Sequence, residues 1–287
     1  MTGPTGSGKT QICLKLPAEQ YEVVSFDSRQ VYKYLQLGTA KPSKHELEQI
    51  PHHLVDFLEP SQTLNAKVYS ELAEEVVLQI WEKNKIPILT AGTGFYLKAF
   101  LHGMYQVPEV SEEVQTYLNQ LSKEEKLNLL KEKDPYSFQK IHPNDSYRIH
   151  RALEIYFSGK VWAELSKSKE NGFLEKFHPE VEGFFIDWPR ALLYERINQR
   201  AKQILELGLL EETKFVAQKF GKDCPALKSL GYSSVLEFLE GLRDKDSLLE
   251  EFSRAHRNYA KKQITWFKKE PFVKPVTFRK ILDFFML

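Results

Sequence analysis

Residues 1–16 read MTGPTGSGKTQICLKL, and Gly3 to Thr10 fit the pattern G-x-x-x-x-G-K-[ST] of a phosphate-binding loop. Such a loop joins the end of a buried β-strand to the start of a helix, and its backbone N–H groups surround an anion. Lys9 supplies a positive charge and Thr10 a hydroxyl group for Mg²⁺. The candidate phosphate-binding residues are therefore Gly3, Pro4, Thr5, Gly6, Ser7, Gly8, Lys9 and Thr10.

The strand that should precede this loop is missing from the sequence. In a parallel sheet that strand is central and buried on both faces, so its absence would leave its neighbours unpaired. We therefore expect that Met1 is not the true start, that about five to ten residues rich in Val, Ile and Leu precede it, and that Met1 ends their strand. The alternative is a real 287-residue chain that is poorly folded or inactive.

The composition is that of an ordinary soluble globular protein, with 42% hydrophobic and 28% charged residues. The 40 Lys and Arg against 39 Asp and Glu mean that attraction to nucleic acid has to come from local clustering. Cys13 and Cys224 are too few for a disulfide framework and suit a reducing cytoplasm. No signal peptide or membrane-spanning run is present, so we expect a cytoplasmic protein.

The first hundred residues alternate short apolar runs with helical patterns, which is typical of βαβ units and a parallel sheet. Residues 21–27 and 86–94 read as buried strands, and residues 66–84 between them read as an amphipathic helix. The predicted fold class is α/β, with a P-loop NTPase-like parallel sheet core whose first strand is missing.

Lys- and Glu-rich helices follow Pro108, with start signals at Ser111, at Ser122 with Glu125, and at Asp134. We predict an inserted helical domain at 108–175. The core is then formed by 1–107 and 176–287. It includes a strand at 181–189 and ends in a helix at 253–269 that carries six Lys or Arg and no acid.

Asp27 follows the second predicted strand at the carboxyl edge of the sheet, where ligands bind in open α/β folds. Its carboxylate could coordinate a metal through water or accept a proton, although it could also simply begin a turn. Arg190, Arg196 and Arg200 could lie over a transferred phosphate, or form a solvated helix face. For the adjacent His52 and His53 we favour a loop over a metal site.

Seven segments occur in one order along the chain: GPTGSGKT, FDSRQVYK, LGTAKP, PHHLVD, AGTGFYLKA, IHPNDSYRIHRALEIYFSGK and YAKKQITWF. Together they resemble the tRNA dimethylallyltransferases, the bacterial-type tRNA prenyltransferase family, over about residues 3 to 270. The resemblance implies an enzyme that transfers a dimethylallyl group from dimethylallyl diphosphate to the exocyclic amine of the adenosine 3′-adjacent to the anticodon, giving N6-dimethylallyladenosine.

The resemblance also implies roles for individual residues. The phosphate loop binds the diphosphate with Mg²⁺, which Thr10 coordinates, and Asp27 is the general base. Lys9 and Arg200 stabilise the departing diphosphate, and Thr93 lies at the reaction centre.

The tRNA anticodon stem-loop is the implied partner, and no membrane is involved. The implied tRNA-binding residues are Asp27, Ser28, Arg29, Gln30, Tyr147, Arg148, Ile149, His150, Arg151, Lys228, Gly231, Tyr232, Arg257, Lys261, Lys262 and Gln263. The sequence departs from the family pattern at Tyr147, where Gln is expected, at Ser233, where a basic residue is common, and at Ala91, where Gly is usual. It carries no carboxyl-terminal Cys/His finger, which fits a bacterial or organellar form, and we expect a monomer.

Two other classes of protein are compatible with parts of the pattern. A small-molecule or nucleotide kinase would use the same loop with ATP and would transfer its γ-phosphate. A non-catalytic RNA-binding module would keep the basic helix but would have no use for a complete phosphate loop beside Asp27. For Trp266 in that helix we favour a place in the core.

Overall fold

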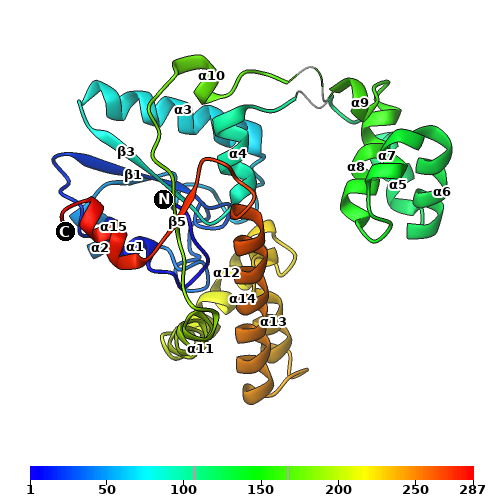
Figure 1. Ribbon diagram of the computed structural model, residues 1–287. Coiled ribbons are helices and arrows are strands. Elements are labelled where there is room, and N and C mark those ends of the chain that lie inside the picture. Colours follow the sequence, from blue (N-terminus) through cyan, green and yellow to red (C-terminus); the bar gives the residue numbers. More distant parts are fainter. Residues whose placement is uncertain (106–107, 166, 168) are drawn as a thin grey trace. The chain divides into compact units, whose positions relative to one another are not determined.

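The computed structural model describes residues 1–105, 108–165, 167 and 169–287, which form two compact units (Figure 1). Unit 1 consists of Met1–Phe100 and His178–Leu287, and unit 2 consists of Leu101–Phe177. The predicted insertion at 108–175 lies inside unit 2, and the predicted boundary at residue 107 lies outside the described residues.

Unit 1 contains all five strands of the described part of the chain. Its strands are β1 (Tyr21–Phe26), β2 (His52–His53), β3 (Ile86–Ala91), β4 (Phe184–Ile186) and β5 (Lys274–Val276). Its helices are α1 (Lys9–Cys13), α2 (Lys44–Gln49), α3 (Ala66–Glu82), α4 (Gly94–His102, whose last two residues belong to unit 2), α11 (Arg190–Glu206), α12 (Leu209–Phe220), the 3₁₀ helix η1 (Pro225–Lys228), α13 (Tyr232–Leu239), α14 (Lys245–Phe267) and α15 (Phe278–Phe284).

The strands pair in parallel, in the order β2-β1-β3 and, separately, β4-β5. The predicted α/β fold with a parallel sheet is therefore confirmed. Strand β1 lies in the middle because its residues form a buried run, YEVVSF, that can face helices on both sides. Helix α3, capped by the Asn65 side chain on the Val68 N–H group, packs against β1 and β3.

The first two residues lie between β3 and β4. Thr2 forms parallel bridges to Ala91 and Phe185, and its N–H group donates to the Phe184 carbonyl at 2.7 Å. The Ala91 N–H group donates to the Met1 carbonyl at 3.1 Å. Met1 and Thr2 therefore occupy the place at which the sequence predicts the end of a further strand. The predicted longer chain stays a prediction.

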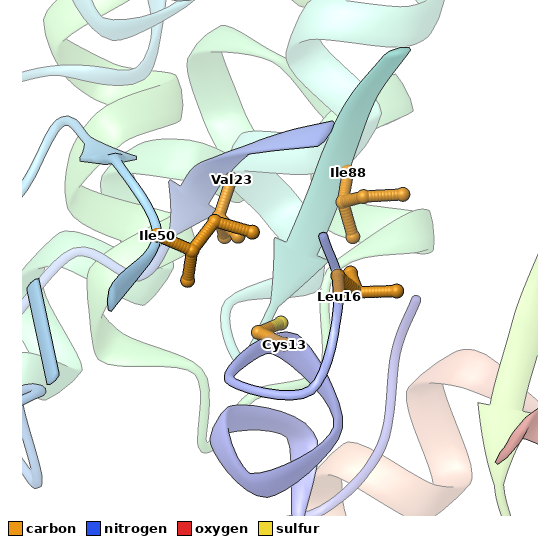
Figure 2. Packing of buried hydrophobic residues seen from close by; sticks show 5 residues of the cluster. All are labelled: Cys13, Leu16, Val23, Ile50 and Ile88. Atoms are coloured by element: carbon orange, nitrogen blue, oxygen red, sulfur yellow. The ribbon is translucent and has the colours of Figure 1, made fainter. Parts of the chain in front are cut away.

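An apolar cluster holds α1 and the turn after it against the sheet. Figure 2 shows the five buried side chains of this cluster, namely Cys13, Leu16, Val23 of β1, Ile88 of β3 and Ile50, which precedes β2. Each of these side chains is buried, and full burial of a side chain of this size contributes about 1.5–3 kcal/mol. The phosphate loop is thus anchored through the helix that follows it.

Unit 2 is helical in its described residues. Its helices are α5 (Glu112–Gln120), α6 (Lys123–Lys133), α7 (Pro135–Lys140), α8 (Ser146–Phe157), α9 (Trp162–Leu165) and α10 (Phe173–Phe177). The predicted start signals are confirmed, since Ser111 caps α5, Ser122 and Glu125 form a capping box on α6, and Asp134 caps α7. Leu118, Leu130, Ile149, Ala152 and Leu153 form the core.

Three expectations about secondary structure are wrong. His52 and His53 form β2 rather than a loop, because the Val23 N–H group of β1 donates to the Pro51 carbonyl and starts a parallel ladder there. The basic helix is the second half of α14, which begins at Lys245 after the Asp244 cap. Strand β5 and helix α15 follow it near the carboxyl end.

Within the described residues, none of the helices combines the length and the apolarity that a membrane span requires.

Glu22 of β1 is the centre of a buried ion cluster. Its carboxylate lies 2.7 Å from His53 Nε2, 3.2 Å from Lys83 Nζ and 3.0 Å from Lys85 Nζ. Burial alone would raise the pKa of Glu22, but the hydrogen bonds from Lys85, His53 and Lys83 outweigh burial and lower that pKa to about 2. A buried carboxylate is stable here because three basic groups surround it.

We expect Glu22→Gln to lower the free energy of unfolding at neutral pH by about 2 to 3 kcal/mol. The pKa of Glu22 is about 2 in the folded protein against an ordinary 4.5, so its contribution is complete above pH 4.5 and is lost as the pH falls toward 2. Urea unfolding between pH 3 and pH 7 measures this. Glu82→Gln, at an exposed position, is the control, and an equal effect of the two variants at pH 7 would contradict the expectation.

Candidate active site

A cavity of about 790 Å³ lies in unit 1 at the carboxyl ends of β1 and β3. Its walls come from segments 5–11, 27–30, 38–42, 92–93 and 228–230, together with Glu46, Arg196, Gln199, Arg200, Gln203, Ile204, His256, Tyr259 and Gln263. The phosphate loop, the segment after β1, the turn after β3 and faces of α11 and α14 thus meet at one space.

Two side chains from outside the phosphate loop bind its carbonyl groups. Arg196 Nε donates to the Gly6 carbonyl at 2.9 Å, and Trp188 Nε1 donates to the Ser7 carbonyl at 3.0 Å. The Arg196 guanidinium also stacks over the Trp188 ring, 4.7 Å from its centroid. Because these carbonyl oxygens have donors, they do not repel an anion bound inside the loop.

Lys9 and Arg200 are two of the cations that line the cavity. Lys9 Nζ donates to the carbonyls of Gly3 at 2.8 Å and Pro4 at 3.2 Å, and burial lowers the pKa of Lys9 to about 8. Burial also lowers the pKa of Arg200, and the neighbouring Arg196 adds to this effect. No carboxylate in the described ranges forms an ion pair with Arg200, so a bound anion would be its counter-ion. Arg190, by contrast, is exposed and packs on Tyr194, outside the cavity.

Asp27 has one oxygen occupied and one directed toward the turn after β3. Its Oδ1 accepts hydrogen bonds from the Arg29 N–H group at 2.9 Å and the Gln30 N–H group at 3.3 Å. A Cβ atom at Gly92 would lie 2.7 Å from Asp27 Oδ2, so only glycine lets the carboxylate approach this closely. Thr93 Oγ1 accepts from the Ser28 N–H group at 3.2 Å. Asp27 and Thr93 are therefore neighbours at the cavity wall.

The donor set of the cavity fits a magnesium ion bound together with a diphosphate. Within the described residues no three His, Cys, Asp or Glu side chains cluster as ligands. Mg²⁺, however, usually takes one or two protein ligands and fills its octahedron with water and phosphate oxygens. A second cavity of about 30 Å³, enough for one water molecule, is lined by both Thr10 and Asp27. The predicted ligand Thr10 thus lies beside Asp27, the one carboxylate among the described residues that line that space.

The model of the IPP transferase family matches residues 30–270. This chain belongs to the IPP transferase family.

Curated relatives and solved structures agree with this membership. Proteins named tRNA dimethylallyltransferase from Leptospira biflexa and Leptospira interrogans are 47% and 42% identical over 278 and 284 residues. The two alignments cover 96% and 99% of this chain, and 93% and 96% of the two relatives. The crystal structure of a tRNA delta(2)-isopentenylpyrophosphate transferase from Staphylococcus epidermidis is similar with a TM-score of 0.69 and 28% identity, covering 99% of this chain and 95% of that one.

A structure of a eukaryotic dimethylallyltransferase acting on tRNA has a TM-score of 0.79 at 25% identity, covering 98% of this chain and 74% of that one. The resemblance stated from the motifs is confirmed.

In this family member, two residues predicted to contact tRNA make internal contacts at the cavity. Gln263 Oε1 accepts from the Thr5 N–H group at 2.8 Å, and Gln263 Nε2 donates to the Gly92 carbonyl at 2.8 Å. Gln30 Nε2 donates to the Ala40 carbonyl at 3.1 Å. Gln263 therefore joins the phosphate loop to the turn beside Asp27, and Gln30 fixes the loop at 38–42.

Two further residues predicted to contact tRNA have buried side chains. Ile149 packs in the core of unit 2, and Tyr232 is fully buried in unit 1 next to Gly231, the residue that caps α13. Neither side chain is accessible to RNA. Lys228 does line the cavity.

The other predicted tRNA residues on α8 and α14 are exposed or half-buried in their own units. Tyr147 on α8 is 78% exposed, and Arg148, His150 and Arg151 beside it pair with Asp145 or Glu154. On α14, Arg257 donates to Asn198 and Glu250, whereas Lys261 and Lys262 are exposed and form no ion pair with a described residue.

Lys41, His256 and Tyr259 are among the cavity residues that were not predicted as site residues. Lys41 is buried and donates to the Tyr32 carbonyl and to Asp56. Burial and then Asp27 raise the pKa of Tyr259 to about 12, so its hydroxyl stays a donor, and it lies 3.2 Å from the Gly92 carbonyl. The spacing i, i+3, i+7 of His256, Tyr259 and Gln263 is a sequence signal for one helix face.

We expect Gln263→Leu to lower the free energy of unfolding by about 1 to 3 kcal/mol, because the Thr5 N–H group loses its acceptor and receives no other. Chemical denaturation measures this difference. Lys262→Leu, at the adjacent exposed position, is the matched control and should change stability by less than about 0.5 kcal/mol. Equal stabilities of the two variants would show that the link between loop and turn contributes nothing.

Proposed function

We propose that this chain transfers a dimethylallyl group from dimethylallyl diphosphate to the exocyclic amine of the adenosine 3′-adjacent to the tRNA anticodon. The observation that carries the proposal is the cavity that joins a phosphate loop to Asp27 and Thr93. The loop suits a diphosphate, and the carboxylate suits the proton of an attacking amine. The names of the curated relatives support the same reaction.

The wall of loop and arginines would hold the diphosphate. The loop amides, Lys9 and Arg200 neutralise the charge that develops as the diphosphate departs. With a pKa of about 8, Lys9 is mostly protonated at neutral pH, and a bound anion raises that pKa further. Mg²⁺, held by Thr10, would add a further positive charge to the leaving group when it is bound.

The acceptor side of the cavity would hold the adenosine. As the new carbon–nitrogen bond forms, the allylic carbon–oxygen bond breaks, and Asp27 accepts a proton from the amine. The free Asp27 Oδ2 is suited to this, because Oδ1 is held by backbone donors. The hydroxyl of Thr93 would orient the reacting groups. The products are N6-dimethylallyladenosine in the tRNA and diphosphate.

The adenosine would have to leave its stack in the anticodon loop to reach this cavity. Of the predicted tRNA contacts, Ser28, Arg29 and Lys228 at the cavity and Lys261 and Lys262 on α14 are the best placed. On α8, the exposed Tyr147 and Arg148 and the half-buried His150 and Arg151 form a group suited to the same partner. We further propose that the enzyme is monomeric and acts in the cytoplasm, which suits its two free cysteines.

Incubation with labelled dimethylallyl diphosphate and bulk unmodified tRNA, followed by mass analysis of the nucleosides, tests the proposal. The expected product is dimethylallyladenosine in the tRNA. A parallel incubation with ATP labelled at the γ-phosphate tests the kinase alternative. Transfer of that phosphate without any prenylated nucleoside would overturn the proposal.

We expect Asp27→Asn to lower the single-turnover rate by about 10² or more, since a general base typically contributes 10²- to 10⁴-fold. The amide keeps an oxygen for the Arg29 and Gln30 N–H groups, so the turn is retained and tRNA affinity should stay within several-fold. Rapid-quench kinetics and filter binding measure the two quantities. A near-normal rate would remove Asp27 from the mechanism.

The double variant Lys261→Ala, Lys262→Ala should weaken tRNA binding and reduce the slope of log K against log[salt] by about 1.5. Fewer counterions are then released, while diphosphate binding is unchanged. Lys274→Ala is the control, because this exposed lysine on β5 pairs with Glu182. If the double variant kept the salt slope of the wild type, the exposed face of α14 would not contact RNA.

A further inference from the structure

Glu212 of α12 binds the loop that forms one wall of the cavity. Its Oε2 accepts hydrogen bonds from the N–H groups of Gln36 at 2.8 Å and Leu37 at 2.7 Å. Its Oε1 lies 3.3 Å from the Gly38 N–H group. Three successive backbone amides thus converge on one carboxylate, an arrangement that binds anions strongly.

The same carboxylate binds a second segment of the cavity wall. Glu212 Oε1 accepts from the Tyr232 hydroxyl at 2.6 Å, and Tyr232 is fully buried. Burial and the Glu212 charge raise the pKa of Tyr232 well above 10.0, so the hydroxyl remains a donor. A Cβ atom at Gly38 would lie 2.4 Å from the Tyr232 oxygen, so the loop contacts the tyrosine directly.

Neither Glu212 nor Tyr232 lines the cavity, but the segments attached to them do. The amides of 36–38 lead into 38–42, and Tyr232 follows 228–230. The loop is rigid in itself, because Gln36 Nε2 donates to the Lys41 and Pro42 carbonyls at 2.8 and 2.9 Å. A displacement of the amides at 36–38 is therefore passed on to 38–42.

We propose that Glu212 is a positioning residue that sets the spacing between segments 38–42 and 228–230, and thereby the acceptor side of the cavity. It acts through these two walls and touches no reacting atom. That the binding of the adenosine depends on this spacing rests on the proposed function. The phosphate loop is held separately, by Arg196, Trp188 and Gln263.

The test compares Glu212→Gln, Tyr232→Phe and the control Glu211→Gln, an exposed neighbour on α12. We expect Glu212→Gln to raise KM for tRNA about tenfold, while KM for dimethylallyl diphosphate changes less than about twofold. Tyr232→Phe keeps the amide contacts and loses only the hydrogen bond from the Tyr232 hydroxyl to Glu212, so it should raise KM for tRNA about threefold. Glu211→Gln should match the wild type.

Backbone amide exchange provides a readout that does not need the reaction. Glu212→Gln should speed exchange in 36–38 and in 228–232 but not in 5–11, whereas a general loss of stability would speed all three. Equal effects on both KM values, or exchange that rises everywhere alike, would overturn the inference. If Glu212→Gln does not fold, an unchanged KM for tRNA in Tyr232→Phe overturns it. If the wild-type protein prenylates no tRNA, the proposed function is rejected, and amide exchange alone then tests the role of Glu212.

Discussion

The site depends on one constraint: in a loop that binds an anion, the carbonyl oxygens must accept hydrogen bonds from other groups of the protein. Two of these donors come from distant parts of the sequence, since Trp188 precedes α11 and Arg196 lies on it, whereas Lys9 belongs to the loop itself. Each bond is an ordinary one of about 1 kcal/mol, or more where the donor is charged. Together they fix the loop in a shape that an anion does not need to induce.

The sequence motifs assign helix α14 to RNA binding alone, but the helix also forms part of the cavity wall. Its buried face, with His256, Tyr259 and Gln263, forms part of the cavity wall, and its exposed face carries Lys261 and Lys262. A helix that is capped at Asp244 and packed on α11 and α13 is a rigid body, so its two faces keep a constant relation. RNA bound at these lysines would therefore contact the same helix that holds the phosphate loop through Gln263.

The elements that could be predicted from the sequence are those that depend on short local patterns. The elements that depend on residues far along the chain could not be predicted. The phosphate loop, β1, β3, α3 and the caps at Ser111, Ser122 and Asp134 follow from short patterns. Strand β5 has only three residues and exists because β4 lies beside it, which no pattern at 274–276 reveals. Motifs likewise identify segments rather than the directions of side chains. The spacing of Ile149 to Ala152 and Leu153 could have placed it in the core. The buried hydroxyl of Tyr232, by contrast, donates to Glu212, which lies twenty residues away in the sequence.

The place of Cys13 in the apolar cluster under α1 also lowers the reactivity of its thiol. Burial raises the pKa of the Cys13 thiol to about 12, so the thiolate that oxidants and alkylating reagents attack is almost absent at neutral pH. Cys13 lies only three residues beyond Thr10, and modification there would push α1 away from the sheet. The packing that anchors the loop is thus also its chemical protection.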